Sequence, residues 1–274
     1  MSIEGIRGWL IDIEGTLVVD KSYRPVPGAL EWLATLVKQG TPFAILTNNT
    51  TMTRAELGSR LREVGFAIED DRIISCQDRA VQILHELGSP ECWVLGSDSL
   101  RCTLRDGGLR VFDLAHETPG EDELPRALIL GWMDNPDARL LSRAVELLQD
   151  PRVELVTLHK NRIFRNKGRL EPGLGAWARA LEYAAGREAV VAGKPSLDLF
   201  RAGARLLQLT PEQIAMVGDD PQADLAPATE LGMKTVFVLS GKYSDTSVLN
   251  RMPVEFRPEV IADSVAELDR SQHR

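Results

Sequence analysis

Two apolar stretches that lie far apart in this chain of 274 residues both end in carboxylates. The first is Ile11-Asp12-Ile13-Glu14-Gly15-Thr16-Leu17, and the second is Val217-Gly218-Asp219-Asp220. Each begins like a buried strand, and the ligands of an open α/β sheet bind at the carboxyl ends of its strands. Clustered carboxylate oxygens suit a hard cation such as Mg²⁺ that holds a phosphate. We therefore expect both stretches to contribute to one site.

Strand-like and helix-like segments alternate near both ends of the chain, which predicts a doubly wound parallel sheet. The expected strands of this core are 9–13, 42–46, 73–74, 189–192, 214–217 and 235–239, and its expected helices are 29–38, 54–64, 177–184, 196–207 and 225–231.

A second α/β unit is expected between these core segments. Its predicted parts are strands at 92–95, 128–130 and 153–158, helices at 78–87 and 138–148, a loop-rich stretch at 106–124 and a basic loop at 159–168. The predicted domains are therefore a core of residues 1–76 and 183–274 and an inserted α/β cap of residues 77–182.

Composition and charge exclude several classes of protein. The net charge of −8 argues against a nucleic-acid partner, because nucleic-acid binding needs a basic face. No window approaches the ~20 apolar residues that span a bilayer, and residues 1–8 do not resemble a signal peptide. Cys76, Cys92 and Cys102 lack metal-ligand spacing and are too few for a secreted disulfide scaffold. We expect a cytoplasmic protein without nucleic-acid or membrane partners.

Other polar residues also follow predicted strands. Thr47 and Asn48 offer a hydroxyl, an amide and backbone donors for phosphoryl oxygens. Lys194 can neutralise charge on Asp12 and on a phosphoryl group, although a lysine in a loop more often faces solvent. Asp12 itself can be a nucleophile toward phosphorus, or it can simply close a turn.

Asp219, Asp220 and Asp224 form an acidic cluster in the second stretch. Such carboxylates repel one another unless a cation lies among them or they point apart. Asp224 suits two roles equally well, that of a ligand and that of an acidic charge at a helix N-terminus.

In this order, the motifs resemble those of the haloacid dehalogenase (HAD) superfamily of aspartyl-phosphate phosphohydrolases. The matching residues are Asp12 through Thr16, Thr47 with Asn48, Lys194, and Asp219 with its neighbours. The insertion is similar to that of the capped subclass IIA, the NagD and p-nitrophenylphosphatase-like members. Segments 159–168, 180–184 and 241–243 look closest to the haloacid dehalogenase-like hydrolase domain-containing protein 2 group. The resemblance implies an α/β fold, with a Rossmann-like HAD core and an inserted α/β cap.

The resemblance also implies a Mg²⁺ site and a nucleophile. Asp12 would be both the nucleophile and a metal ligand. The backbone carbonyl of Glu14 and the carboxylate of Asp219 would be further ligands. Asp220 and Asp224 would contact these ligands without binding the metal ion themselves. A second set of residues would bind the phosphoryl group: Thr47, Asn48 and the catalytic Lys194.

Glu14 departs from the family motif, which has an aspartate at this position as the acid and base. Its carboxyl group can still transfer a proton, but a displacement of ~1 Å can cost on the order of 10²-fold in rate. We predict a Mg²⁺-dependent phosphatase that hydrolyses a small phosphorylated metabolite and is slow or unusually specific. Phosphoamidase activity is a variant of this prediction. The alternative is a catalytically impaired protein that binds or scaffolds phosphometabolites.

The cap is expected to select the substrate. Candidate contacts are Gly131-Trp132-Met133-Asp134-Asn135 and the basic loop 160–167, where Arg162, Arg165 and Lys167 suit an anionic substrate. The alternative for this loop is that its charged residues are only exposed to solvent, as charged loop residues usually are. The alternative role of the cap is to form the interface of a homodimer.

Overall fold

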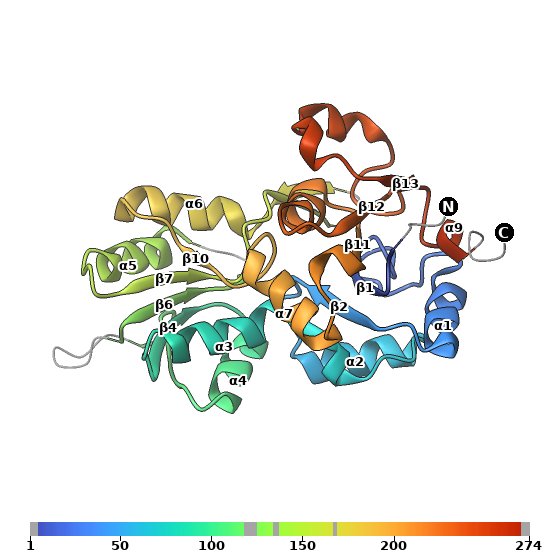
Figure 1. Cartoon of the computed structure of the whole chain (residues 1–274). Helices are drawn as coiled ribbons and strands as arrows, with labels where there is room; N and C mark the ends of the chain where they lie inside the picture. Colours follow the sequence, from blue (N-terminus) through green and yellow to red (C-terminus); the bar gives the residue numbers. More distant parts are fainter. Residues whose placement is uncertain (1–4, 118–124, 134–136, 167–168, 270–274) are drawn as a thin grey trace. The chain divides into compact units, whose positions relative to one another are not determined.

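The computed structural model describes residues 5–117, 125–133, 137–166 and 169–269 of the chain. These residues form two compact units, which are drawn in Figure 1. The first unit contains Met1–Thr47, Arg54–Ile74 and Lys194–Arg274, and the second contains Asn48–Thr53 and Ser75–Gly193. Each unit has its own sheet, and helices follow most of the strands. The predicted α/β class is therefore confirmed.

The sheet of the first unit has the strand order β13-β12-β11-β1-β2-β3. Its strands are β1 (Gly8–Ile11), β2 (Phe43–Thr47), β3 (Ile73–Ser75), β11 (Ile214–Gly218), β12 (Lys234–Val238) and β13 (Val260–Ala262). Its α-helices are α1 (Ala29–Gln39), α2 (Arg54–Glu63), α7 (Leu197–Leu207), α8 (Ala226–Glu230) and α9 (Ala266–Asp269). Because β1 lies in the middle and the chain extends the sheet on both sides of it, this is the doubly wound sheet that the sequence predicts.

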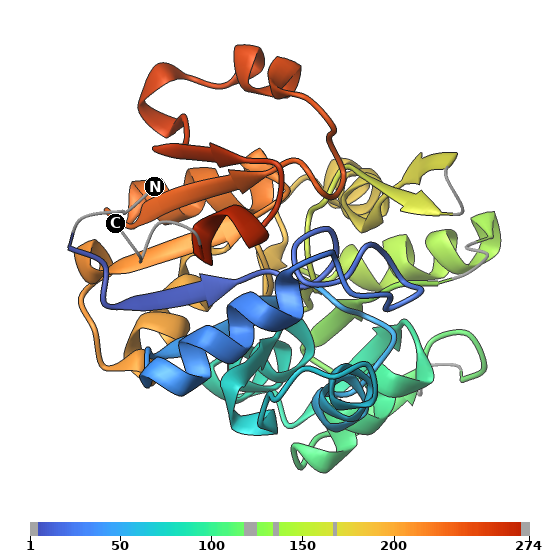
Figure 2. The ribbon, with the colours of Figure 1, turned by 90° about the vertical axis from the view of Figure 1, so that its right-hand side faces the viewer.

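Helices cover both faces of this sheet, since successive side chains of a strand point to opposite faces. Trp9 of β1 packs edge-on against Trp32 of α1, with the ring centroids 5.4 Å apart. Leu10 points the other way, into a core cluster that contains Phe200 of α7. Figure 2 shows α1 next to β1 in this unit. Strand β1 is consequently buried along its whole length, as strands covered on both faces are.

The second unit has a parallel sheet with the strand order β10-β7-β6-β4-β5. Its strands are β4 (Glu91–Leu95), β5 (Arg110–Asp113), β6 (Ala127–Leu130), β7 (Glu154–Thr157) and β10 (Val190–Val191). Its α-helices are α3 (Cys76–Glu86), α4 (Asp98–Asp106), α5 (Ala138–Leu148) and α6 (Leu174–Ala185). Strands β8 (Ile163–Asn166) and β9 (Arg169–Pro172) form a separate antiparallel hairpin. A buried cluster that extends from Cys76 to Ala192 gives this unit its own core.

Several segments differ from the sequence expectation. Strand β5 lies in the stretch 106–124 that was expected to be loop, and strand β8 lies in the expected basic loop. Helix α6 contains the expected core helix 177–184, and strand β10 pairs with β7, so residues 177–193 belong to the second unit and not to the first. All three strands are four residues or shorter, and so short a strand carries too little periodicity to reveal its place in a sheet.

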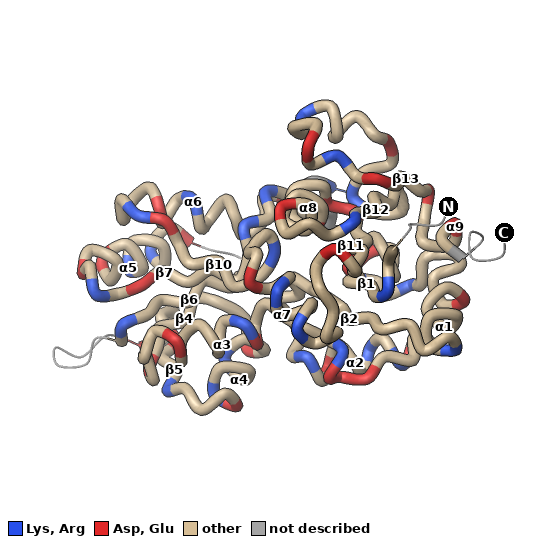
Figure 3. Tube along the Cα trace, viewed as in Figure 1, with Lys and Arg blue, Asp and Glu red and all other residues tan. Residues whose placement is uncertain are grey.

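Charged residues of both signs are interspersed along both units (Figure 3). Within the described ranges, no helix is long and apolar enough to cross a membrane.

Truncating Leu10 is expected to destabilise the protein strongly. The side chain of Leu10 has no exposed surface and lies at the centre of the first unit. A Leu→Ala change at such a site costs about 2–5 kcal/mol, because it leaves a cavity. A urea titration of Leu10→Ala followed by circular dichroism measures this loss. The matched control is Leu206→Ala on α7, where the leucine is 38% exposed. Similar losses in the two variants would contradict the assigned core.

Candidate active site

Adjacent strands of the first sheet bring three sequence-predicted residues to one edge. Strands β1 and β11 are parallel neighbours, and Ile11 pairs with Val217 in their register. Asp12 follows β1, and its N–H donates to the carbonyl of Val217 at 3.0 Å. Asp219 follows β11, while Thr47 is the last residue of the neighbouring strand β2. The side-by-side ends of these strands thus place Asp12 and Asp219 at the same edge, as the strand-end argument predicts.

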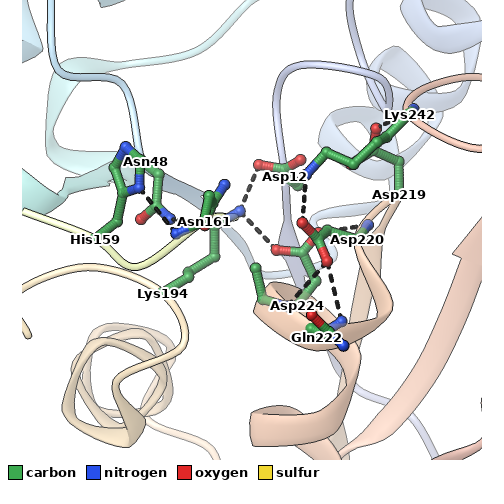
Figure 4. A network of polar contacts seen from close by, with 11 residues as sticks. Asp12, Asn48, His159, Asn161, Lys194, Asp219, Asp220, Gln222, Asp224 and Lys242 are labelled. Atoms are coloured by element: carbon green, nitrogen blue, oxygen red, sulfur yellow. Dashed lines mark hydrogen bonds and ion pairs between the residues drawn. The ribbon is translucent and has the colours of Figure 1, made fainter. Parts of the chain in front are cut away.

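Lys194 lies inside this cluster. Its side chain is only 3% exposed, and its Nζ lies 2.5 Å from Oδ1 of Asp12 and 2.7 Å from Oδ1 of Asp224 (Figure 4). Burial opposes the charge of the ammonium group, but Asp12 and Asp224 outweigh burial and raise the pKa of Lys194. Lys194 is therefore a buried cation that contacts the candidate nucleophile, and not a lysine that faces solvent.

Asp12, Asp219 and Asp224 are buried, and a carboxylate oxygen of each lies within 4.8 Å of the other two. Burial raises the pKa of all three carboxyl groups, that of Asp224 to about 7. Repulsion by Asp12 adds to the rise for Asp219 and Asp224, whereas Lys194 opposes the rise for Asp12 and Asp224. When all three are ionised, the ammonium group of Lys194 balances only one of their three negative charges.

These residues fit a divalent metal ion. Oxygen atoms of carboxylates are the ligands that hard cations prefer, and a bound cation would relieve the repulsion that raises these pKa values. Asp12 and Asp219 are the carboxylates that the sequence suggests as ligands. Asp224 adds a third at the same place, and its contact with Lys194 also gives it a role as the partner of the buried lysine.

Asp220 has different partners from these three carboxylates. It forms an ion pair with Lys242, and its Oδ1 accepts from the N–H of Gln222 at 3.0 Å and of Ala223 at 3.1 Å. Burial opposes the charge of Asp220, but Lys242 and the backbone hydrogen bonds together outweigh burial and lower the pKa of the carboxyl group. Asp220 is therefore a stably ionised group that caps the helical turn Pro221–Leu225.

Glu14 lies close enough to Asp12 to act on it electrostatically. Burial is the main cause that raises the pKa of Asp12, and the charge of Glu14 adds to it. The same charge adds to the burial that raises the pKa of Tyr23, a buried phenol whose ring lies 5.7 Å from the guanidinium carbon of Arg60. Glu14 itself is partly exposed.

Asn48 belongs to the second unit, although Thr47, its neighbour in the chain, belongs to the first. Nδ2 of Asn48 donates to Oδ1 of Asn161 at 3.1 Å, and the N–H of Asn161 donates to Nδ1 of His159 at 3.2 Å. The amide of Asn48 thus contacts the segment that was expected to be the basic loop.

Lys160, a candidate substrate contact, has acidic partners in its own unit. It forms ion pairs with Glu182 and, at 3.0 Å, with Glu188. Burial opposes its charge, but hydrogen bonds to these carboxylates raise the pKa of Lys160. Several other expected contacts lie outside the described residues, namely Asp134, Asn135, Lys167 and the side chain of Arg165.

The segment Ser240-Gly241-Lys242 is a part of the site that the sequence motifs did not assign. The N–H of Lys242 donates to Oδ2 of Asp219 at 2.6 Å, and Oγ of Ser240 donates to the carbonyl of Gly15 at 2.7 Å. A Cβ atom at Gly15 or Gly241 would collide with the Asp219 carboxylate, and Gly15 also has a φ of +87°. The sequence does carry a signal for this segment: its polar residues follow soon after the strand β12, and the other site residues also follow strands.

Two family models match the chain. The haloacid dehalogenase-like hydrolase model matches residues 9–110, and a HAD-hydrolase-like model matches residues 191–268. Chronophin of Mus musculus is 33% identical over 273 residues, which cover 96% of this chain and 91% of chronophin. The haloacid dehalogenase-like hydrolase domain-containing protein 2 of Homo sapiens is 30% identical and covers 90% of each chain.

Solved structures have the same architecture. The p-nitrophenyl phosphatase from Archaeoglobus fulgidus superposes with a TM-score of 0.83 at 27% identity, covering 96% of this chain and 98% of its own. A parallel α/β core, an inserted α/β unit and a buried acidic site define a capped hydrolase. The chain belongs to the haloacid dehalogenase-like hydrolase family, among the phosphatases of its NagD and p-nitrophenylphosphatase-like subclass. The resemblance in the sequence motifs is confirmed.

Removing the charge of Asp219 is expected to stabilise the metal-free protein at neutral pH. Burial holds the pKa of Asp219 well above its ordinary value of 3.8, so ionisation favours the unfolded chain. This destabilisation is absent where the carboxyl group is protonated in both states, and it grows as the pH rises above the unfolded value. In EDTA, Asp219→Asn should therefore melt above wild type near pH 7.5, with a smaller difference near pH 4.5.

Asp220→Asn is the matched control for this experiment. The pKa of Asp220 is lowered, so its charge stabilises the folded state at pH values above the ordinary value of 3.8. This variant should therefore melt below wild type at neutral pH, the opposite sign. A melting temperature of Asp219→Asn below that of wild type in EDTA would contradict the electrostatic description of the site.

Proposed function

We propose that this protein is a Mg²⁺-dependent phosphatase that hydrolyses a small phosphorylated metabolite through an aspartyl-phosphate on Asp12. The observation that carries the proposal is that buried Asp12 lies 2.5 Å from Lys194 and in the same cluster as Asp219 and Asp224. A nucleophile, a fixed cation beside it and carboxylates for a metal ion are parts that phosphoryl transfer uses. Membership of the hydrolase family supports the same reaction.

The proposed first step transfers the phosphoryl group to the protein. An oxygen of Asp12 attacks phosphorus, the bond between phosphorus and the leaving oxygen breaks, and Glu14 gives its proton to that oxygen. Lys194 favours the ionised form of Asp12 before the attack and balances part of the charge of the phosphoryl group.

The proposed second step releases inorganic phosphate. Glu14 takes a proton from a water molecule, whose oxygen attacks phosphorus, and the bond between phosphorus and Asp12 breaks. Asp12 returns as a carboxylate and Glu14 as an acid, so the two steps together add one water molecule across the ester bond.

The proposed Mg²⁺ ligands are Asp12, Asp219 and the backbone carbonyl of Glu14. When bound, the ion supplies the positive charge that lets an anionic nucleophile approach an anionic ester. Asp220 and Asp224 support this group, and Thr47 and Asn48 remain the predicted donors to phosphoryl oxygens. A small phosphorylated metabolite remains the predicted substrate class.

Replacing Asp12 tests the mechanism directly. Asp12→Asn removes the nucleophile and should lower turnover of a panel of small phosphate esters with Mg²⁺ by at least about 10³-fold. EDTA should abolish wild-type turnover, and added Mg²⁺ should restore it. Asp71→Asn, at an exposed aspartate of the first unit, is the control that should retain wild-type rates. Turnover that survives Asp12→Asn would sink the mechanism.

Substitutions of Glu14 test the proton-transfer step. Glu14→Gln removes the acid and should lower turnover by about 10²–10⁴-fold. Glu14→Asp provides the shorter acid of the family motif and should raise turnover by up to about 10²-fold, since proton transfer is sensitive to displacements of ~1 Å. A fall in rate with Glu14→Asp would instead mean that Glu14 is already well placed in the wild-type protein.

The presence of Glu14 also favours a second candidate function, the binding of a phosphometabolite without hydrolysis. The predicted metal site uses only the backbone of residue 14, so binding does not require the shorter acid. In this case the wild-type protein would bind a panel member without turnover, and only Glu14→Asp would hydrolyse it. Equilibrium binding and turnover, measured on the same panel, separate the two functions.

A further inference from the structure

We propose that Lys242 is a positioning residue for the metal site: its backbone N–H fixes the carboxylate of Asp219, and its side chain is anchored by the ion pair with Asp220. The proposal rests on the proposed function, because it gives Lys242 a part in Mg²⁺ binding. Neither the sequence motifs nor the family resemblance assigns this role.

The first argument is the set of contacts around Asp219. Oδ2 of Asp219 accepts from the N–H of Lys242 at 2.6 Å, as Figure 4 shows. The backbones of Gly15 and Gly241 lie against the same carboxylate, so closely that neither position has room for a Cβ atom. The hydrogen bond from Ser240 to the carbonyl of Gly15 joins the two loops. Asp219 is thus held between the loop after β1 and the loop after β12.

The second argument is the anchor of Lys242 itself. Its side chain is 13% exposed, and its Nζ pairs with Oδ2 of Asp220, which is also 13% exposed. The N–H of Asp220 donates to Oδ2 of Asp224 at 3.1 Å. The ion pair therefore ties the loop after β12 to the segment 219–224, which contains two of the three clustered carboxylates.

The charge and the position of Lys242 predict opposite effects on metal binding. If Lys242 acted through its charge alone, its loss would leave Asp220 unpaired and would strengthen the attraction for a cation. If it acts by positioning Asp219, its loss weakens binding, because groups that orient metal ligands typically contribute about 10–100-fold to metal affinity.

The test compares two variants of the full chain. Lys242→Met removes the anchor, and Lys242→Met/Asp220→Asn removes it while keeping the net charge of the pair at its wild-type value. Calorimetric titration with Mg²⁺ alone should give about tenfold weaker binding for both variants. The Mg²⁺ concentration for half-maximal hydrolysis should rise similarly, with turnover at saturating Mg²⁺ nearly retained. Lys242→Arg, which keeps the ion pair, should recover most of the affinity.

Lys234→Met is the matched control. Lys234 lies on β12 in the same unit, its side chain is 44% exposed, and its Nζ is 3.6 Å from Glu259. Its replacement should leave Mg²⁺ binding unchanged. Circular dichroism reports whether each variant folds, and the double variant guards against misfolding because it leaves no unpaired buried ion.

Mg²⁺ binding by folded Lys242→Met or by the folded double variant that is as tight as in wild type, or tighter, would overturn the proposal. A wild-type protein that binds no Mg²⁺, or hydrolysis that persists in Asp12→Asn, would instead overturn the proposed function. The two failures are therefore distinguishable.

Discussion

The contact of Lys194 with Asp12 and Asp224 is the interaction on which the rest of the site depends. A buried ammonium group is tolerated only with anionic partners, and buried carboxylates equally need cations. This mutual requirement joins residues 12, 194 and 224, which come from three distant parts of the chain. Because the carboxylates outnumber the lysine, the pairing leaves a negatively charged site that can attract a divalent cation. The same ion pairs thus stabilise the buried charges and set the charge of the site.

Strand ends explain why much of this site could be predicted from the sequence. Asp12 and Asp219 each follow an apolar run, and adjacent parallel strands end at the same edge of a sheet. The doubly wound core was readable for a similar reason, because helices and strands alternate regularly there. To predict that site residues follow strands, one needs only the local periodicity of the strands and the assumption that these strands are parallel neighbours. Both conditions are met by β1 and β11 in the first unit.

Other features depend on contacts that no local pattern encodes. The two residues of β10 are equally compatible with either sheet, and only their pairing with β7 decides between them. Asn48 directly follows Thr47, yet long-range contacts assign it to the second unit. The same is true of Lys242, whose partner Asp220 lies on a different loop. In the sequence, Asn48 and Lys242 each look like an ordinary polar residue near the end of a strand.

The two glycines beside Asp219 restrict how this site can evolve. Gly15 and Gly241 approach each other so closely that a Cβ atom on Gly15 would lie 2.8 Å from the Cα of Gly241. A side chain at either position meets backbone and the Asp219 carboxylate, so a change at one glycine cannot be compensated by a smaller residue at the other. New substrates must therefore be accommodated through changes elsewhere in the chain, while residues 15 and 241 remain glycine.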